Sequence, residues 1–198
     1  MQTNNIFLAS MFGGIVLFVW GAFSHMVLGL GESSIKQIPN EEIVVAAMRD
    51  NITEAGLYFF PGMERSSGMT EQQGKAAMDQ WAEKWTAGPN GMLVYNREGS
   101  QPLSPKQFIV ELISDIIAAL IAAFLLAKAV GGLGGFWQRV QFVTALGLFS
   151  FFAVETAYWN WYGFPFRFTV DSLFDQVAGF FLAGLVLGWR VKTASAGG

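Results

Sequence analysis

Apolar residues along this chain gather into four long blocks that are separated by polar stretches. A helix needs about 20 mainly apolar residues to cross a bilayer, and four blocks meet that requirement, at about 6–30, 107–130, 137–158 and 170–190. The pattern therefore predicts a polytopic membrane protein. Four glycines between 131 and 135 join the second block to the third, which predicts that these two helices are antiparallel neighbours. The first block lacks a basic leader and a small-residue cleavage site, so we expect an uncleaved anchor and not a signal peptide.

The polar stretch between the first two blocks has the patterning of a small folded domain. Asn40 precedes an apolar-patterned segment and is the expected N-cap of a helix. A second helix is expected over 70–87, opened by a capping box of Thr70 and Gln73. Aromatic and β-branched residues form two short runs that are expected to pair as strands, at 57–60 and 92–95.

These elements divide the chain into a first transmembrane helix (1–30), a cap (31–106) and three further transmembrane helices with a tail (107–198). Ser104 and Pro105 are expected to open the second transmembrane helix as its N-cap and first residue. The predicted fold class is a mainly α membrane protein with four transmembrane helices and a small extracytoplasmic α/β cap between helices 1 and 2.

Basic residues beside the apolar blocks predict the orientation of the chain in the membrane. With four spans, both termini and the 128–139 link share one side, which has no acidic residue but carries Lys128, Arg139, Arg190 and Lys192. The positive-inside rule places such a side in the cytoplasm. We therefore expect both termini inside the cell and residues 31–106 outside it.

Trp81 and Trp85 lie four residues apart, on one face of the helix expected over 70–87. A domain as small as the cap is only marginally stable alone, so this face could dock on the membrane helices or on a partner. Internal packing of the cap is the alternative, and the one we favour.

Short motifs spread over the whole chain carry a family resemblance: Trp20-Gly21, Ser24-His25, Ile38-Pro39-Asn40-Glu41, Tyr58-Phe59-Phe60-Pro61-Gly62 and Tyr158-Trp159-Asn160-Trp161-Tyr162-Gly163-Phe164-Pro165. With these motifs the sequence resembles a family of bacterial four-helix inner-membrane proteins that has no established activity. The resemblance implies the architecture and a bacterial inner membrane, and it implies no catalytic residues.

Six acidic or histidine side chains fall inside the expected spans: His25, Glu111, Asp115, Glu155, Asp171 and Asp175. Such groups cost about 2.5–3.5 kcal/mol each at a helix centre and mark functional sites by default. In the expected topology all six lie in the outer half of the membrane, so they are our candidate ligand- or ion-binding residues. Structural polar packing, with helix dipoles and Arg167 stabilising the acids, is the alternative that we favour.

The residue types of this cluster suit only some ligands. Carboxylates with one imidazole fit a proton relay or a divalent cation, and the identity of any metal is open. His25 alone is weak evidence for an axial ligand to a haem or another tetrapyrrole. Ser24 and His25 would point about 100° apart on a helix, which is the wrong geometry for a catalytic dyad, and we assign no catalytic residue.

An internal similarity links the second and fourth spans. Residues 108–125 and 168–185 align without gaps at an offset of 60, with Asp115 opposite Asp175 and Glu111 opposite Asp171. The two acids of each copy are four residues apart and so share one helix face. A parallel repeat of two helical hairpins and chance similarity between apolar helices both account for it.

Aromatic residues are dense at the end of the third block, where the chain carries Tyr158, Trp159, Trp161 and Tyr162. Tyrosine and tryptophan concentrate at the membrane–water interface, and that role accounts for all four. A platform on which a ligand stacks is the alternative.

Composition narrows the classes of function. Only 14% of the 198 residues are charged and the net charge is −3, against about 25% charged residues in a soluble domain. The chain thus lacks the basic surface that nucleic acid requires. It contains no cysteine, which excludes disulfides and thiolate chemistry. We expect its partners to be the lipid bilayer and other membrane-protein subunits or a second copy of the chain.

Our leading expectation is a non-enzymatic inner-membrane protein that acts as an accessory or complex subunit. The alternative is a small proton- or cation-coupled transporter that uses the carboxylate cluster of the outer leaflet. A second alternative is a membrane enzyme that acts where the cap meets the membrane.

Overall fold

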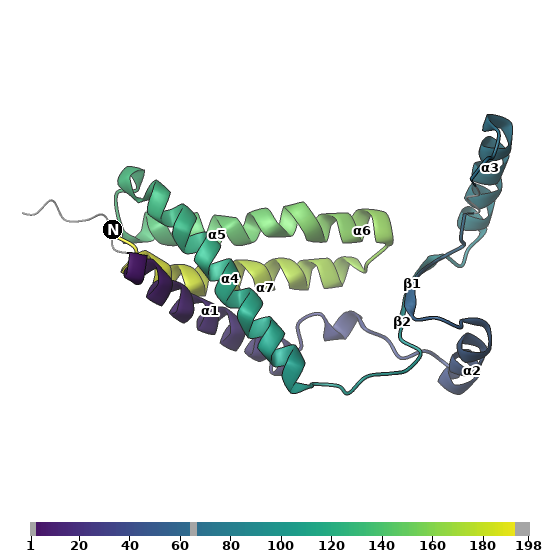
Figure 1. Ribbon diagram of the computed structural model, residues 1–198, viewed down its shortest axis with the longest axis horizontal. Helices are drawn as coiled ribbons and strands as arrows, with labels where there is room; N and C mark the ends of the chain where they lie inside the picture. Colours follow the sequence, from purple (N-terminus) through teal and green to yellow (C-terminus); the bar gives the residue numbers. More distant parts are fainter. Residues whose placement is uncertain (1–2, 64–66, 193–198) are drawn as a thin grey trace, which may run out of the picture. The chain divides into compact units, whose positions relative to one another are not determined.

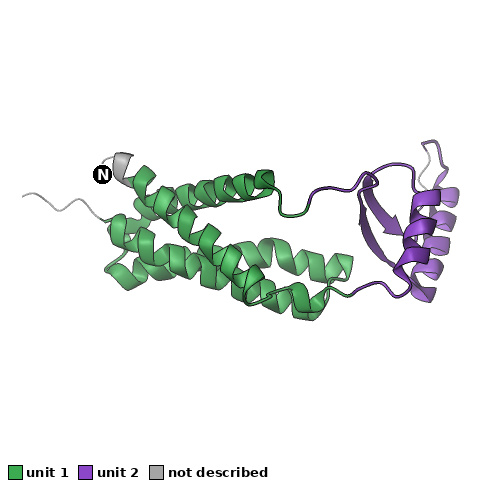
Figure 2. Cartoon of the chain, turned by 90° about the horizontal axis from the view of Figure 1, so that it is seen from below, with its two compact units in different colours: residues 1–36, 102–198 green, residues 37–101 purple. Residues whose placement is uncertain are grey.

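The computed structural model describes residues 3–63 and 67–192, so the chain after 192 lies outside the described residues. The chain is mostly helical, with a small two-stranded sheet. It divides into two compact units, which we call the helical unit (residues 1–36 and 102–198) and the inserted unit (37–101) (Figure 2). Each unit is described by itself below.

The helical unit contains four helices that are long and apolar enough to cross a membrane, which confirms the four predicted spans. The first, second and fourth spans are α1 (Thr3–Met26), α4 (Pro105–Ala129) and α7 (Phe166–Arg190). The third span is built from α5 (Phe136–Ser150), a π-helical segment η3 (Phe151–Glu155) and α6 (Thr156–Tyr162). Short 3₁₀ turns, η1 (Glu32–Ser34) and η2 (Val130–Gly132), lie in the connections.

The four spans pack in the order α4–α1–α7–α5. Helix α4 contacts mainly α1, and α5 contacts mainly α7, whereas contacts between α4 and α5 are sparse. The glycine-rich link does turn the chain back after α4 (Figure 1), but the expected close neighbours are not each other's main packing partners. Figure 1 also shows the N-terminus at the same end of the helical unit as this link.

Small residues allow the helices to approach closely, as is usual between membrane helices. A Cβ added to Gly14 in α1 would lie 2.5 Å from the Cα of Ile116 in α4. A Cβ added to Gly147 in α5 would lie 2.7 Å from the carbonyl oxygen of Gln176 in α7. These glycines therefore determine which helices can pair.

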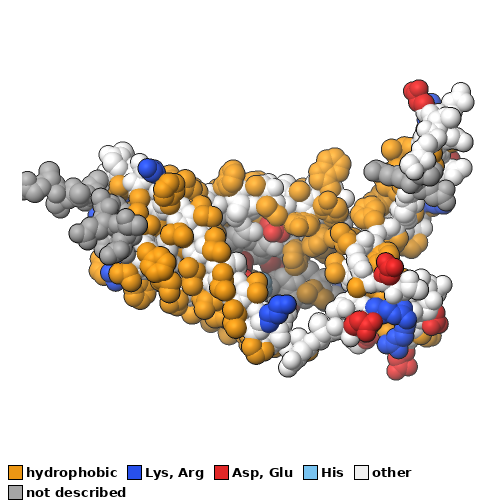
Figure 3. Space-filling model, in the orientation of Figure 1, with side chains coloured by type: hydrophobic (Ala, Val, Ile, Leu, Met, Phe, Trp, Pro, Cys, Tyr) orange, Lys and Arg blue, Asp and Glu red, His pale blue; other side chains and the backbone are white. Residues whose placement is uncertain are grey.

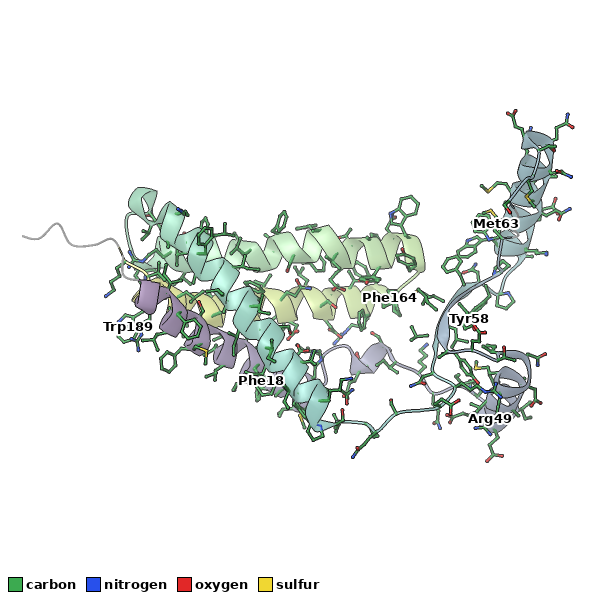
Figure 4. All side chains as sticks on the ribbon, in the orientation of Figure 1. Phe18, Arg49, Tyr58, Met63, Phe164 and Trp189 are labelled. Carbon is green, nitrogen blue, oxygen red and sulfur yellow. The ribbon has the colours of Figure 1, made fainter. Side chains whose placement is uncertain are left out.

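The buried apolar core lies toward the end of the helical unit where α1 begins and α7 ends. Its members come from the start of α1, the end of α4, the start of α5 and the end of α7, and include Ala9, Ala122, Ala123, Leu126, Val143, Leu187 and Val191. Figure 4 shows Trp189 near this end and Phe164 at the opposite end, in the turn between α6 and α7. The opposite end is where the polar residues of the spans gather.

The inserted unit contains α2 (Glu41–Asn51), β1 (Gly56–Phe60), α3 (Glu71–Ala87) and β2 (Gly91–Tyr95). The strands pair antiparallel, with Leu57 opposite Val94, as predicted. The capping boxes are also present, Thr70 with Gln73 before α3 and Ser104 with Gln107 before α4. Figure 3 shows charged side chains gathered over this unit and mainly hydrophobic ones over the helical unit.

Asn40 differs from the expectation in one respect. It does precede α2, but its backbone is left-handed, with φ of 52°, and its side chain makes no capping hydrogen bond. A left-handed residue cannot place its side chain over the first turn as an extended N-cap does. At the C-terminal end of α2, backbone carbonyl groups accept hydrogen bonds from a side chain outside the helix. Arg97 Nη1 donates to the carbonyl oxygens of Arg49 and Ile52 at 2.9 and 2.7 Å.

Trp81 and Trp85 pack inside the inserted unit. The Trp85 ring stacks on Phe59 of β1 with centroids 5.1 Å apart, and it also lies against the Trp81 ring at 5.3 Å. Trp81 Nε1 donates a hydrogen bond of 3.0 Å to the carbonyl oxygen of Pro61. These contacts are those of internal packing, the favoured of the two roles considered from the sequence.

Candidate functional site

All six acidic and histidine residues of the spans lie toward the end of the helical unit opposite the buried apolar core. His25 is in the last turn of α1, and Glu155 ends the π-helical segment of the third span. Glu111 and Asp115 lie in the first turns of α4, as Asp171 and Asp175 do in α7. The alternating helix directions thus place the six groups at one end, as the predicted topology requires.

Two cavities lie at this polar end of the helical unit. The larger one, of about 340 Å³, lies between α1, α4 and α7, and its polar lining consists of His25, Glu111, Asp115, Asp175 and Gln176. The smaller one, of about 210 Å³, is lined by His25, Glu155, Asp171, Asp175 and Gln176 among others. His25, Asp175 and Gln176 border both cavities, so all six predicted residues belong to one continuous region.

Asp175 stands at the junction of the two cavities. Its Oδ2 lies 3.7 Å from His25 Nε2, which is too long for a hydrogen bond. Its Oδ1 is buried and has no hydrogen-bond partner among the residues that the structure describes. His25 Nδ1 lies 3.1 Å from the carbonyl oxygen of Leu30, while 59% of the His25 side chain is exposed. The Asp175 side chain therefore lies at the wall of both cavities, with 23% of its surface exposed and no hydrogen bond to its carboxylate from the described residues.

Asp171 has a structural role. Its carboxylate is buried and accepts hydrogen bonds from the backbone N–H of Gly31 at 3.2 Å and from the Ser33 hydroxyl at 3.5 Å. Arg167, one turn earlier on α7, forms an ion pair with it, with Nε 3.0 Å from Oδ1. Arg167 thus neutralises one of the acids, as predicted. The hydrogen bonds of Asp171 hold the segment after α1 against α7.

Gln176 connects Glu155 to the site and was missed by a search restricted to ionisable residues. Its Nε2 donates to Glu155 Oε1 at 3.4 Å, and its side-chain oxygen accepts a hydrogen bond from the hydroxyl of Ser150. The π-helical segment η3 begins directly after Ser150 and ends at Glu155. Such segments are frequent at functional sites. A glutamine directly after Asp175 in an apolar span was the available signal in the sequence.

Trp20 was also missed, because a tryptophan in an apolar span has no distinguishing pattern. Its Nε1 donates a hydrogen bond of 3.0 Å to the carbonyl oxygen of Asp175. Its ring faces Gly179, at which an added Cβ would lie 3.0 Å from the Trp20 Cδ1. Trp20 therefore holds α1 against α7 beside the site and forms part of the larger cavity wall.

The acids of the 60-residue similarity have different surroundings in α4 and α7. Asp115 and Asp175 occupy equivalent positions and both line the larger cavity. Glu111 is exposed at the cavity edge, whereas its counterpart Asp171 is buried against the segment after α1. Asp115 and Asp175 thus have corresponding positions beside the larger cavity, whereas Glu111 and Asp171 do not.

The geometry limits the ligands that this region can hold. Within 3–63 and 67–192, no group of three or more His, Asp or Glu side chains is arranged to hold a metal ion. The described linings contain carboxylates and a histidine but no Lys or Arg. The Ser24 hydroxyl donates to the carbonyl oxygen of Gly21 at 3.1 Å within its own helix, so it forms no dyad with His25. The region is suited to a proton or a small cation without a preformed metal cage.

The aromatic residues of α6 lie apart from these cavities. Tyr158, Trp159, Trp161 and Tyr162 are exposed and line neither cavity. Their ring contacts join α6 to its own surroundings, such as Tyr158 with Phe164 at 5.2 Å and Trp159 with Phe166 at 5.9 Å. This position fits residues at a membrane–water interface.

Comparison of the chain with protein-family models, with curated proteins and with solved structures found no match. The functional argument therefore depends on the geometry of the helical unit.

Proposed function

We propose that this protein is a small proton- or cation-coupled transporter of a bacterial inner membrane. The observation that carries the proposal is the convergence of His25, Asp115, Glu155 and Asp175 on two adjoining cavities at one end of the helical unit. Ionisable groups inside spans are costly, and they line ion and proton pathways. The opposite end is filled by the apolar core, as expected for a binding site open to one side only.

The orientation follows from the basic residues. Lys128, Arg139, Arg190 and Lys192 lie at or near the ends of the spans beside the apolar core, away from the cavities. By the positive-inside rule that end is cytoplasmic. The cavities then face outward, and residues 31–106 are extracytoplasmic. In this orientation, which is part of the proposal, a proton or cation enters the site from outside the cell.

The test is flux in proteoliposomes that hold the full chain and a pH-sensitive dye. A proton gradient is imposed with Na⁺ or K⁺ as the only other cation, and lumen pH is followed. Flux above that of empty liposomes is expected for the wild type, and Asp115→Asn and Asp175→Asn should abolish it. Asp79→Asn, on the exposed helix α3, is the matched control and should retain flux. Wild-type flux equal to that of empty liposomes contradicts the proposal, as does unchanged flux in both site variants.

A non-enzymatic subunit of a larger membrane complex is the second candidate. The observation that favours it is the packing order α4–α1–α7–α5, because contacts between α4 and α5 are too sparse to close the four helices around a shared centre. Ile121 on α4 and Phe149 on α5 are both exposed in the single chain, and neither lines the larger cavity. Additional helices, from another subunit or a second copy, would complete the assembly.

The cysteine-free sequence makes this candidate directly testable. Single cysteines are introduced as Ile121→Cys and Phe149→Cys, and native membranes are treated with a short bifunctional thiol reagent. A cross-linked species, together with a mass above that of one chain after gentle detergent extraction, supports the subunit function. A monomer in both measurements contradicts it.

A further inference from the structure

The larger cavity has the size and walls of a site for an organic ligand. Its volume of about 340 Å³ falls in the range of roughly 300–1,000 Å³ that is usual for small-molecule pockets. Most of its lining is apolar, with side chains from α1, α4, α7 and the segment just before α4, namely Leu17, Phe18, Met26, Leu103, Phe108 and Phe180. A fully hydrated inorganic ion gains nothing from such walls, whereas an apolar group does.

The polar part of the lining selects for positive charge. Glu111, Asp115 and Asp175 all border the cavity, and no Lys or Arg is among its described lining residues. An anionic ligand would be repelled by three carboxylates, and a neutral one would leave them without a partner. The Asp175 carboxylate accepts no hydrogen bond from the described residues, and 23% of its side chain is exposed, so an ammonium group in the cavity would supply the missing donor.

Aromatic rings in the wall add to the preference for a cation. Phe18 and Phe108 form an edge-to-face pair with centroids 6.5 Å apart, and Figure 4 shows Phe18 beside the crossing of α1 and α4. Trp20 provides a third ring on the same wall. Ammonium groups are attracted to aromatic faces within about 6 Å, and the remaining ring surface accommodates an apolar body.

We propose that the cavity between α1, α4 and α7 binds a protonated organic amine that carries an apolar body. The ammonium N–H groups donate to the Asp175 and Asp115 carboxylates, and the apolar body lies against Phe18, Phe108 and Leu17. The inference rests on the proposed function in that it names the substrate class of the same site. Its test measures binding rather than flux, so that either proposal can fail alone.

The experiment compares three probes that have similar phenylalkyl bodies and polar groups of different charge. These are 4-phenylbutylamine, 4-phenylbutanol and 4-phenylbutyrate, titrated calorimetrically at neutral pH into the purified full chain in lipid nanodiscs. Empty nanodiscs of the same lipid are titrated in parallel to subtract partitioning into the bilayer. We expect the amine to bind at least about tenfold more tightly than the alcohol, and the butyrate not to bind.

Two variants connect the binding to the cavity. Asp175→Asn should weaken amine binding about tenfold or more and leave binding of the alcohol unchanged, because only the charged interaction is lost. Trp189→Phe, at the far end of α7, is the control and should bind the amine as the wild type does. If Asp175→Asn does not fold, Glu111→Gln at the exposed edge replaces it and should weaken amine binding by a smaller factor.

Several outcomes overturn the inference. Equal affinity for the amine and the alcohol would show a slot for any apolar chain, such as a lipid acyl chain. Amine affinity that the carboxylate variants leave unchanged would place the binding elsewhere. Amine binding without proton or cation flux would support this inference and overturn the transport proposal, whereas flux that depends on Asp175 without amine binding would do the reverse.

Discussion

Trp20 Nε1 donates a hydrogen bond of 3.0 Å to the carbonyl oxygen of Asp175, which joins α1 to α7 beside the two cavities. Trp20→Phe keeps an aromatic ring at this position and removes the donor. Hydrogen bonds between membrane helices contribute about 0.6 kcal/mol on average and up to about 1.7. We therefore expect Trp20→Phe to lower the unfolding free energy by about 1 kcal/mol, measured by circular dichroism in mixed micelles of increasing SDS content.

Trp189→Phe is the matched control for this prediction. The Trp189 ring is exposed at the other end of α7, where it lies 4.5 Å from the Arg190 guanidinium. Its replacement should change the unfolding free energy much less. An equal loss in both variants would mean that the hydrogen bond to Asp175 adds no stability.

Gly14 and Gly21 on α1 provide a second matched pair. A Cβ at Gly14 would lie 2.5 Å from the Cα and 2.7 Å from the backbone nitrogen of Ile116, whereas a Cβ at Gly21 would meet nothing within 4 Å. Because the obstruction is backbone, Gly14→Ala must push α1 away from α4. We expect it to cost about 1–3 kcal/mol, while Gly21→Ala leaves stability unchanged or raises it. The same SDS titration measures both, and equal stability of the two variants would contradict the close packing of α1 on α4.

Asp171 provides a third prediction, since its assigned role is structural. Asp171→Ala removes the acceptor of the Gly31 N–H and of the Ser33 hydroxyl. The loss of one buried partner costs about 1–3 kcal/mol, so hydrogen exchange of the 29–35 backbone should become about tenfold faster or more. Exchange is followed by mass spectrometry on the intact chain in nanodiscs.

Arg167→Ala is the control for the Asp171 prediction. About 70% of the Arg167 side chain is exposed, and exposed ion pairs contribute little to stability. We expect exchange over 29–35 to remain close to that of the wild type. Unchanged exchange in Asp171→Ala would show that this carboxylate does not fasten the segment.

The four spans were predictable because a helix that crosses a membrane needs about 20 consecutive, mainly apolar residues, and such a long segment is easily found in a sequence. Local motifs were predictable for a similar reason. Thr70 with Gln73 and Ser104 with Gln107 form hydrogen bonds between residues three apart, so the sequence alone contains both partners. Because successive spans run in opposite directions, the sequence also predicted that His25 and Asp175 would lie at the same end.

Contacts between distant residues were not predictable in the same way. The association of α4 with α1 depends on Gly14 meeting Ile116, and nothing local to either residue indicates the other. Trp20 bonds to a residue 155 positions away, and Gln176 to residues 21 and 26 positions away, so no local pattern reveals these contacts. Asn40 has a common capping residue type, yet its backbone is left-handed, a second conformation that asparagine favours, and the residue type alone does not decide between the two.

The π-helical segment Phe151–Glu155 determines the rotational setting of the third span. A π turn accommodates one residue more than an α turn, and each residue of an α-helix advances by about 100° around the axis. Deleting one residue from 151–155 would therefore leave a regular α-helical turn and keep the direction of the α6 aromatic residues. Conversion of the full-length segment to an α-helix would instead rotate α6 by about 100°. The contact of Glu155 with Gln176 thus depends on the backbone conformation of this one turn as much as on residue identity.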